Sequence, residues 1–439
     1  MCGWANEECA NEECANEEFV YSIAMNFLYS IIVRVIFLGI GFGSLFIPKA
    51  KLWMKGRKNW RARYSAIPFH QHKWVWFHCC SYGEFQDGKS VLEKFRIDYP
   101  SHKILLTFSS PSGYELLKAY KGVDLVTYLP LDTASNADFF VDCVKPAFVF
   151  FVRNDIWPNY VRALHKRKIS MCLISFTLTA KSKSFKFPQQ SFYRNTFQSF
   201  SAIFVQDKCS KNILEQHKFS NHIFVAGNCR IDCVKKIQDE HFEIPSIEKF
   251  VSGQFAVIAG STLTKDRQLF LSAYSELKNE NIKWIIVPHE IHKTEIDEAK
   301  KMFGNELLLF SEANQLTSAH KLLWVDHVGL LAKMYNYAQI AFVGGGFNSI
   351  GIHNILEPAA ALCAVCFGPN HRDLPEAIGL LANGAKVIHT EQELKDHILY
   401  YKENPGDLSS IQITNMNYVR ENSGATEKIF DQLEKYFRH

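Results

Sequence analysis

The sequence lacks the ligand patterns of a metal-binding protein. Its 12 cysteines are scattered along 439 residues, and Cys363 and Cys366, which form a C-x-x-C, have no second such pair nearby. The segment His289-Glu290-Ile291-His292 is not the H-E-x-x-H motif of a zinc protease, because its second histidine falls at the wrong spacing. We therefore predict neither a structural nor a catalytic metal, and no cofactor.

The motifs of dinucleotide and nucleic-acid binding are also missing. The glycines Gly344, Gly345 and Gly346 do not have the G-x-G-x-x-G spacing, and no acidic residue follows them at the distance of about twenty positions that a dinucleotide site requires. No nucleic-acid recognition motif accompanies the basic residues, which gather beside an apolar segment. We therefore predict no nucleic-acid partner.

The first 24 residues contain no lysine or arginine. They carry six glutamates in the repeat NEECANEECANEE, and we expect residues 1–24 to be non-native or artefactual, with Met25 as the true start. Without these glutamates the formal net charge rises from +4 to +10. Such a mildly basic protein suits acidic partners or an anionic membrane surface.

Residues 25–48 have no charge except Arg34, and their length is sufficient to cross or deeply enter a bilayer. No cleavage site ends the segment, so we expect a membrane anchor. The anchor could be a helix that spans the membrane or a monotopic helix that lies in its surface. A central arginine makes a span costly unless its side chain reaches the headgroups or pairs with another group. The basic residues from Lys49 to Arg63, with no acid among them, predict that the following domains lie at the cytoplasmic face of an inner membrane.

Short apolar runs separated by helix-length spacers predict two parallel α/β sheets. The first series comprises 74–78, 104–108, 125–128, 148–152, 171–176, 203–206 and 223–226, and the second comprises 255–259, 284–287, 322–325, 340–343, 364–367 and 387–389. Between them, residues 235–252 are charged and lack a strand pattern. The expected organisation is two Rossmann-like domains, 49–234 and 253–439, joined by this linker and facing a cleft.

The stretch from Ile340 to Asn370 predicts a strand, a glycine loop, a helix and a second strand. Asn354 and Glu357 fit a capping pattern, and the Ala-rich run that follows favours a helix to Leu362. The loop Gly344–Gly346 beside a helix N-terminus would form a site for a phosphate-like anion. The alternative is a tight turn kept for packing.

Polar residues follow the expected strands of the first domain. Glu84, after the first strand, is placed to take a proton, although a glutamate there also complements a helix dipole. A second carboxylate, Asp155, follows the fourth strand and is a further catalytic candidate. Hydroxyl-rich segments after the second and third strands, FSSPSGYE and YLPLDT, would bind sugar hydroxyls or phosphate; the acceptor candidates among them are Ser110, Ser112 and Gly113.

The order of these motifs resembles the Kdo transferases (3-deoxy-D-manno-octulosonic acid transferases of lipopolysaccharide assembly). The resemblance runs from Met25 to the C-terminus and is carried by SYGEF, TFSSPSGYE, YLPLDT, DIWPNY, AGNCRID, GST, VPHEI and GGGF…GIHNILEP. It implies a metal-independent, inverting GT-B glycosyltransferase that moves Kdo from CMP-Kdo to a lipid A precursor, lipid IVA. The CMP-Kdo is a donor substrate and not a cofactor.

The resemblance also implies roles for residues. Glu84 is the expected base, and the second domain binds the donor through Ser261, Pro288, His289, Glu290, Gly344, Gly345, Gly346, Asn354 and Glu357. Apart from the resemblance, Arg230 and Lys265 each lie beside a loop motif and are candidate cationic helpers for the donor phosphate, with an ordinary surface role as the alternative. The loop 181–187, which mixes basic and aromatic residues, is a further candidate for the lipid surface.

Two departures from the family pattern keep other functions open. Asp155 stands where the family commonly has glutamate, and the segment 326–331 differs from the family's D-T-x-G-E-L. One alternative is a GT-B transferase with a UDP-sugar donor. Another is a membrane-bound nucleotide-sugar binding protein without catalysis.

Overall fold

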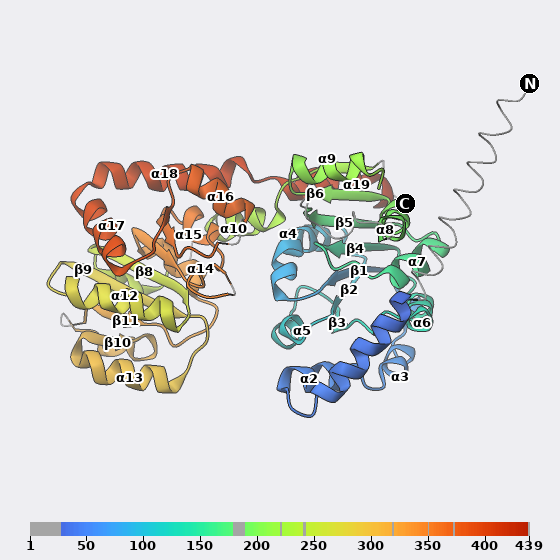
Figure 1. Ribbon diagram of the computed structural model, residues 1–439, viewed down its shortest axis with the longest axis horizontal. Coiled ribbons are helices and arrows are strands. Elements are labelled where there is room, and N and C mark those ends of the chain that lie inside the picture. The colour runs from blue at the N-terminus through green and yellow to red at the C-terminus, as the bar shows by residue number, and fades with distance from the viewer. Residues whose placement is uncertain are drawn as a thin grey trace, which may run out of the picture. The chain divides into compact units, whose positions relative to one another are not determined.

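The computed structural model describes residues 28–178, 189–219, 222–239, 243–317, 320–349, 351–371 and 374–437. The chain divides into two compact units (Figure 1). Unit 1 runs to Asp232 and takes up the chain again from Gly424, whereas unit 2 comprises Cys233–Ser423. The segments 1–24 and 181–187, which carry two of the sequence predictions, lie outside the described residues.

A seven-stranded parallel sheet forms the centre of unit 1, with the strand order β3-β2-β1-β4-β5-β6-β7. The order reverses between β1 and β4, so crossovers leave the sheet in opposite directions there. The strands are β1 (Trp74–Cys79), β2 (Lys103–Phe108), β3 (Leu125–Tyr128), β4 (Phe148–Val152), β5 (Met171–Phe176), β6 (Ala202–Val205) and β7 (Ile223–Val225).

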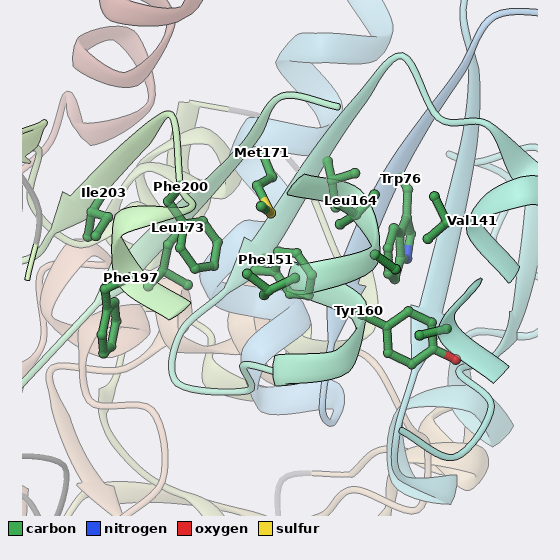
Figure 2. Packing of buried hydrophobic residues seen from close by; sticks show 14 of the residues in the cluster. Trp76, Val141, Phe151, Tyr160, Leu164, Met171, Leu173, Phe197, Phe200 and Ile203 are labelled. Carbon is green, nitrogen blue, oxygen red and sulfur yellow. The ribbon is translucent and has the colours of Figure 1, made fainter. Parts of the chain in front are cut away.

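Helices cover both faces of this sheet, which explains why its strands are apolar on both sides. Figure 2 shows the first layer, where Trp76 and Phe151 pack with Tyr160 and Leu164. This layer includes α3 (Trp60–Ser65), α6 (Ala134–Val144), α7 (Pro158–Lys166), α8 (Gln189–Gln198) and α9 (Lys208–Gln216). The other face packs against α4 (Tyr82–Asp98), α10 (Cys229–Asp239) and α19 (Ala425–Phe437), with α5 (Pro111–Leu117) at its margin.

Unit 2 repeats the plan with a second seven-stranded parallel sheet. Its order is β10-β11-β9-β8-β12-β13-β14, and the reversal falls between β8 and β12. The strands are β8 (Phe255–Thr262), β9 (Ile282–Pro288), β10 (Leu307–Leu309), β11 (Leu322–Trp324), β12 (Ile340–Val343), β13 (Ala364–Phe367) and β14 (Lys386–Val387). The prediction missed β10, a three-residue edge strand.

The helices of unit 2 also lie in two layers. One layer packs α12 (Thr264–Leu277), α13 (Lys293–Phe303), α17 (Glu391–Glu403) and α18 (Pro405–Glu421) against the sheet. The other contains α11 (Pro245–Val251), α14 (Leu331–Met334) and the short helix η5 (Tyr335–Tyr337). The remaining helices are α15 (Leu356–Ala360), α16 (Pro375–Ala382), η3 (Gly304–Glu306) and η4 (Phe310–Gln315).

Two of the expected domain limits differ from the structure. Within residues 235–252, predicted as an interdomain linker, α11 buries Ile247 and Phe250 in the core of unit 2. The last helix, α19, does not belong with the second domain: Ile429 and Leu433 are buried against the sheet of unit 1, and Asp232 accepts hydrogen bonds from Gly424 N and Thr426 N. Neither of these helices was predicted from the sequence, and helical periodicity alone does not show which sheet a helix will cover.

The chain before the first sheet is helical from residue 28 to 43 and again in α2 (Pro48–Arg57). Within the described residues, no helix has both the length and the apolar character needed to cross a bilayer. The helix 28–43, here called the N-terminal helix, and the turn after it expose large apolar side chains: Leu38, Phe42, Leu45 and Phe46 are 69–74% exposed.

Asp132 fixes the start of the N-terminal helix. Its carboxylate accepts a hydrogen bond from the Tyr29 hydroxyl at 2.6 Å and from the backbone N–H groups of Asn159 and Tyr160 at 3.2 Å, in the first turn of α7. Burial raises the pKa of Asp132 to about 6, and these hydrogen bonds offset only part of the effect. Within the YLPLDT segment, Asp132 is therefore a buried carboxylate with a structural role.

The buried Asp132 predicts a pH dependence of stability. Since its pKa is raised from 3.8 to about 6 on folding, the folded state binds the proton more tightly, and the stability contributed at low pH is lost as the pH rises through about 6. The loss amounts to about 3 kcal/mol. Asp132→Asn should flatten this part of the pH profile, measured by urea unfolding between pH 4.5 and 7.5.

The matched control is Asp142→Asn, at an exposed carboxylate whose pKa is lowered by its hydrogen bond to Arg167. That group titrates below the window, so this variant should keep the wild-type slope. An unchanged slope in Asp132→Asn would contradict the assignment.

Candidate functional site

Glu84 lies where the sequence predicts, after β1 and in the first turn of α4. Its Oε2 accepts hydrogen bonds from the backbone N–H of Ser81, at 3.0 Å, and from the Ser81 hydroxyl, so the two residues form a capping box. The side chain is half-buried. The capping role therefore fixes one carboxylate oxygen in place, beside the reversal of strand order between β1 and β4.

Asp155 follows β4, across the same reversal. Its Oδ2 lies 2.9 Å from both His78 Nε2 and Ser109 Oγ. Burial alone would raise the pKa of Asp155, but hydrogen bonds from His78, Trp157 and Ser109 outweigh it and hold the pKa below its ordinary value. Asp155 is therefore a stable anion, and its short side chain reaches a complete set of donors.

His78 is a site residue that the sequence prediction missed. It is fully buried in β1, with Nδ1 2.7 Å from the Thr107 hydroxyl, and Trp157 Nε1 lies 3.0 Å from its Nε2. In the sequence it is one letter of an apolar run. The available signal was that a polar side chain in a doubly covered strand must find buried partners.

Asp155 and Glu84 also share a neighbour. Burial raises the pKa of the Cys80 thiol, and the nearby charges of Asp155 and Glu84 raise it further. Cys80 lies in the turn between β1 and α4. The ends of β1, β2 and β4 thus bring Glu84, Ser109 and Asp155 to one edge of the sheet.

The predicted acceptor residues Ser110, Ser112 and Gly113 begin α5 and have local structural roles. The Ser110 hydroxyl accepts a hydrogen bond from Ser112 N at 3.3 Å and lies 2.9 Å from the Ser112 hydroxyl. A Cβ on Gly113 would lie 2.2 Å from the ring of Phe108, so glycine is required there for packing. The two hydroxyls are half-buried at the end of β2.

Arg57 is another residue whose role the sequence did not show. Its guanidinium donates from Nε to Leu129 O and from a terminal nitrogen to Ser109 O, both at 2.8 Å, and stacks on Trp53 at 3.7 Å. Burial lowers its pKa to about 10, so it stays a cation at neutral pH. This arginine of the basic cluster therefore ties α2 to the loop of Ser109.

The two phosphate-helper candidates lie in different units. Arg230 forms an ion pair with Asp87 at 2.8 Å and donates to the carbonyl of Gly83 at 3.0 Å, so it stands beside the first turn of α4 in unit 1. Lys265 is exposed at the second position of α12 in unit 2.

The predicted donor residues of unit 2 gather at the reversal between β8 and β12. Ser261 takes a left-handed conformation at the end of β8, with φ of 52°, and the N–H of His289 donates to Thr262 O at 3.0 Å. The rings of His289 and His353 stack with centroids 4.3 Å apart. Burial lowers the pKa of His353 to about 4, so this imidazole is neutral. Pro288, His289 and Ser261 thus share one edge with the glycine loop.

The glycine loop is buried, and the reason for its glycines is close packing. A Cβ on Gly344 would lie 2.5 Å from Ser261 O, and one on Gly346 would lie 2.6 Å from the Cα of Gly368. Gly345 has a φ of 94°, and its N–H donates to the buried carboxylate of Asp266 at 2.8 Å. Because Asp266 already occupies this N–H, Gly345 is not an open anion donor, which corrects that part of the prediction.

Asn354 and Glu357 contact each other as predicted, but they do not form a capping box, because the residue at the N-cap of α15 is Ile355, which has no side-chain cap. Asn354 Oδ1 accepts from Leu356 N at 3.1 Å, and its amide donates to Glu357 at 2.9 Å. Helix α15 ends at Ala360 and not at Leu362. Glu290 points to solvent, 3.2 Å from His292 Nε2. Among the described residues, no three His, Cys, Asp or Glu side chains cluster closely enough to hold a metal ion.

Comparison with known proteins confirms the resemblance that the motifs predict. Residues 58–233 match the model of a family described as 3-deoxy-D-manno-octulosonic-acid transferase (kdotransferase). The 3-deoxy-D-manno-octulosonic acid transferase of Chlamydophila psittaci is 26% identical over 374 residues, covering 82% of this chain and 85% of that protein. The chain is thus related to the Kdo transferases and is a glycosyltransferase.

Two further likenesses concern size and fold. A bifunctional glycosyltransferase/methyltransferase of Fusobacterium nucleatum is 24% identical over 419 residues, and the match covers 90% of this chain but only 64% of that longer protein. The crystal structure of a UDP-GlcNAc 2-epimerase from Neisseria meningitidis has a TM-score of 0.59 at 16% identity, covering 82% of this chain and 100% of that one. The second likeness concerns the fold alone and agrees with the predicted α/β, GT-B-like class.

The packing of the glycine loop predicts a stability effect. Gly344→Ala should lower the free energy of unfolding by about 2 kcal/mol, because the new Cβ would meet the backbone of Ser261 and Thr262, which cannot move aside easily. Urea unfolding measures the change. Gly406→Ala is the control, since a Cβ there meets nothing within 4 Å in the first turn of α18 and should leave stability unchanged or slightly higher. Equal stability of Gly344→Ala and wild type would contradict this packing.

Proposed function

We propose that this glycosyltransferase, a relative of the Kdo transferases, moves Kdo from CMP-Kdo to the lipid A precursor, lipid IVA, with inversion and without a metal. The observation that carries the proposal is the match of residues 58–233 to the Kdo transferase family, with Glu84 held in that region beside the reversal of strand order. The relative from Chlamydophila psittaci, of which 85% is covered, also bears the name 3-deoxy-D-manno-octulosonic acid transferase.

Glu84 is the proposed base that takes the proton of the acceptor hydroxyl. Both hydrogen bonds from Ser81 go to Oε2, and among the described residues no partner contacts Oε1. The carboxylate is thus oriented through one oxygen and can accept the proton on the other. Asp155 does not suit the role of base, because its depressed pKa makes it a poor proton acceptor. Its proposed role is electrostatic, as an anion held by His78 and Ser109.

The edge of unit 2 between β8 and β12 is the proposed donor site. Ser261, His289 and His353 line it, and Lys265 stands exposed in the first turn of α12, a helix of 14 residues. A lysine and the N-terminus of a helix of this length together favour an anion such as the CMP phosphate. The neutral imidazole of His353 and the exposed ring of His289 offer a flat surface for the nucleotide.

Kdo transfer from CMP-Kdo to lipid IVA tests the proposal. Glu84→Gln keeps the size of the side chain but removes its basicity, so the transfer rate should fall by about 100-fold or more. The rate is measured with labelled donor, and mass spectrometry of the product gives the number of Kdo units. A mutant as fast as wild type would refute the role of Glu84 as the base.

A binding measurement separates the alternative donors. CMP should raise the melting temperature of the wild type more than UDP does at the same concentration, because a ligand that binds only the folded state stabilises it by mass action. A larger effect of UDP would favour a UDP-sugar donor. Stabilisation by CMP-Kdo without any transfer would favour a binding protein that lacks catalysis.

We also propose that the N-terminal helix attaches the protein to the anionic cytoplasmic surface of the inner membrane as a monotopic anchor. The support is its exposed apolar surface together with the exposed basic residues Lys49, Lys51 and Arg61 that follow. Such a surface enters the headgroup boundary, and the basic residues add attraction to anionic lipids.

Vesicle sedimentation tests the anchor. Replacing Leu38, Phe42 and Phe46 together by serine should reduce partition onto phosphatidylglycerol-containing vesicles by at least about 100-fold, because each apolar side chain contributes about 1.5–3 kcal/mol on burial. The control replaces Met302 and Ile378 of unit 2, which are 72% and 53% exposed, by serine. Equal binding of the triple variant and wild type would refute the proposal.

A further inference from the structure

His78 is a fully buried histidine that lies next to the candidate site without opening onto it. It belongs to β1, between Thr107 of β2 and Asp155 after β4. The His78 side chain is 0% exposed, whereas 16% of the Asp155 side chain is exposed. The carboxylate is therefore within reach of a bound molecule and the imidazole is not. Any effect of His78 on a reaction at this edge has to pass through Asp155.

The contact with Asp155 decides that Nε2 of His78 carries a hydrogen. Nε2 lies 2.9 Å from Asp155 Oδ2. Because the pKa of Asp155 is held low, its carboxylate is ionised, and an ionised carboxylate only accepts hydrogen bonds. A ring with its hydrogen on Nδ1 alone would set a lone pair of Nε2 against the anion. Nε2 is therefore the donor in this contact.

Thr107 decides the role of the other ring nitrogen. Its hydroxyl oxygen accepts the indole N–H of Trp76 at 2.7 Å, since an indole can only donate. The hydroxyl hydrogen then has two possible acceptors, His78 Nδ1 at 2.7 Å and the carbonyl of Phe77 at 3.5 Å. The shorter contact is the better hydrogen bond, so Nδ1 accepts. Hydrogen bonds thus run in one direction through Trp76, Thr107, His78 and Asp155, here called the His78 chain.

The His78 chain has one partly exposed end. Trp76, His78 and Thr107 are fully buried in adjacent strands, and His78 pairs with Thr107 in the register of β1 and β2. Buried polar groups stabilise little in total, and apolar side chains of similar shape could replace a whole set of partners at small cost. The feature that apolar residues could not reproduce is a fixed position for the carboxylate of Asp155.

We propose that His78 is a positioning residue for the transfer reaction: Thr107 orients its ring so that Nε2–H donates to Asp155 and fixes that carboxylate at the edge that carries Glu84. The effect on transfer rests on the proposed function, whereas the orientation of the ring does not. Without the contact the carboxylate is free to move, and a displacement of about 1 Å in a catalytic site can lower the rate by about 100-fold.

Two amide substitutions of His78 separate the hydrogen bond from packing. In His78→Gln the amide can take the place of Nε2 and donate to Asp155, whereas the shorter amide of His78→Asn reaches only the position of Nδ1. His78→Asn should lower kcat by about 100-fold with KM changed far less, because the proposed role of Asp155 is electrostatic and acts on the transition state. His78→Gln should keep kcat within about 10-fold of wild type. Transfer from CMP-Kdo to lipid IVA is measured per folded protein, with folding checked by circular dichroism.

Thr107 gives an independent test of the same chain. Thr107→Val keeps the shape of the side chain but removes the hydroxyl, so it should lower kcat by about 10-fold, and Thr107→Ser, which keeps the hydroxyl, should restore most of the rate. The control is His102→Asn. This half-buried histidine precedes β2, at the opposite edge of the sheet, and its replacement should leave kcat unchanged.

The orientation of the ring is measured without the reaction. In the full-length protein labelled with 15N-histidine, the His78 signals are those that disappear in His78→Gln. Their nitrogen chemical shifts should show a hydrogen on Nε2 and none on Nδ1, and Asp155→Asn should shift the Nε2 signal. A hydrogen on Nδ1, alone or together with one on Nε2, would overturn the His78 chain.

The kinetic outcomes separate this inference from the proposed function. A wild type that transfers Kdo, with His78→Asn as fast as wild type, would overturn the positioning role of His78. Equal losses of kcat in His78→Asn and His78→Gln would also contradict it, because the hydrogen bond to Asp155 would then make no difference. A wild type without Kdo transfer would refute the proposed function, and the nitrogen spectrum would still decide the His78 chain.

Discussion

The two units depend on the same constraint, which is the reversal of strand order within a parallel sheet. Crossovers leave β1 and β4, or β8 and β12, in opposite directions, and the carboxyl ends of these strands are left without a covering connection. Polar side chains after such strands are not covered by the two helical layers that bury the rest of the sheet. Glu84 and Asp155 occupy this position in one unit, and Ser261 and the glycine loop occupy it in the other.

Buried carboxylates hold the loops at these edges. Asp155 is hydrogen-bonded to His78, and Asp87 forms ion pairs with two arginines. Asp266 accepts hydrogen bonds from the N–H groups of Gly345 and Leu263. Each would be costly without its partners, so each fixes the geometry of the segments that supply them. The same rule distinguishes the two carboxylates of unit 1. Asp155 is held as an anion by its hydrogen bonds, whereas Glu84 accepts both of its hydrogen bonds from Ser81 through Oε2.

The sheets could be predicted closely from the sequence because strands that are buried on both faces are continuous apolar runs. β3, β4, β5, β12 and β13 have the expected bounds, whereas β10, only Leu307–Leu309, was too short to stand out. Placement of Glu84 and Asp155 after strands followed from the same pattern, whereas Ser261 lies within β8, which extends to Thr262. The assignment of α19 to a unit could not follow, because an amphipathic helix does not specify which distant sheet will bury it.

The sequence by itself determined the α/β class, the order of the strands along the chain and the family resemblance, since these depend on local periodicity and on motif order. Only the tertiary structure decided what the polar residues do. It showed that three glycines allow backbones to approach within packing distance, that His78 orients Asp155, and that Arg153 and Arg230 meet at Asp87 from segments far apart in the chain. These contacts join residues that sequence spacing cannot relate, because the parallel crossovers of the sheet bring them together only once the chain has folded.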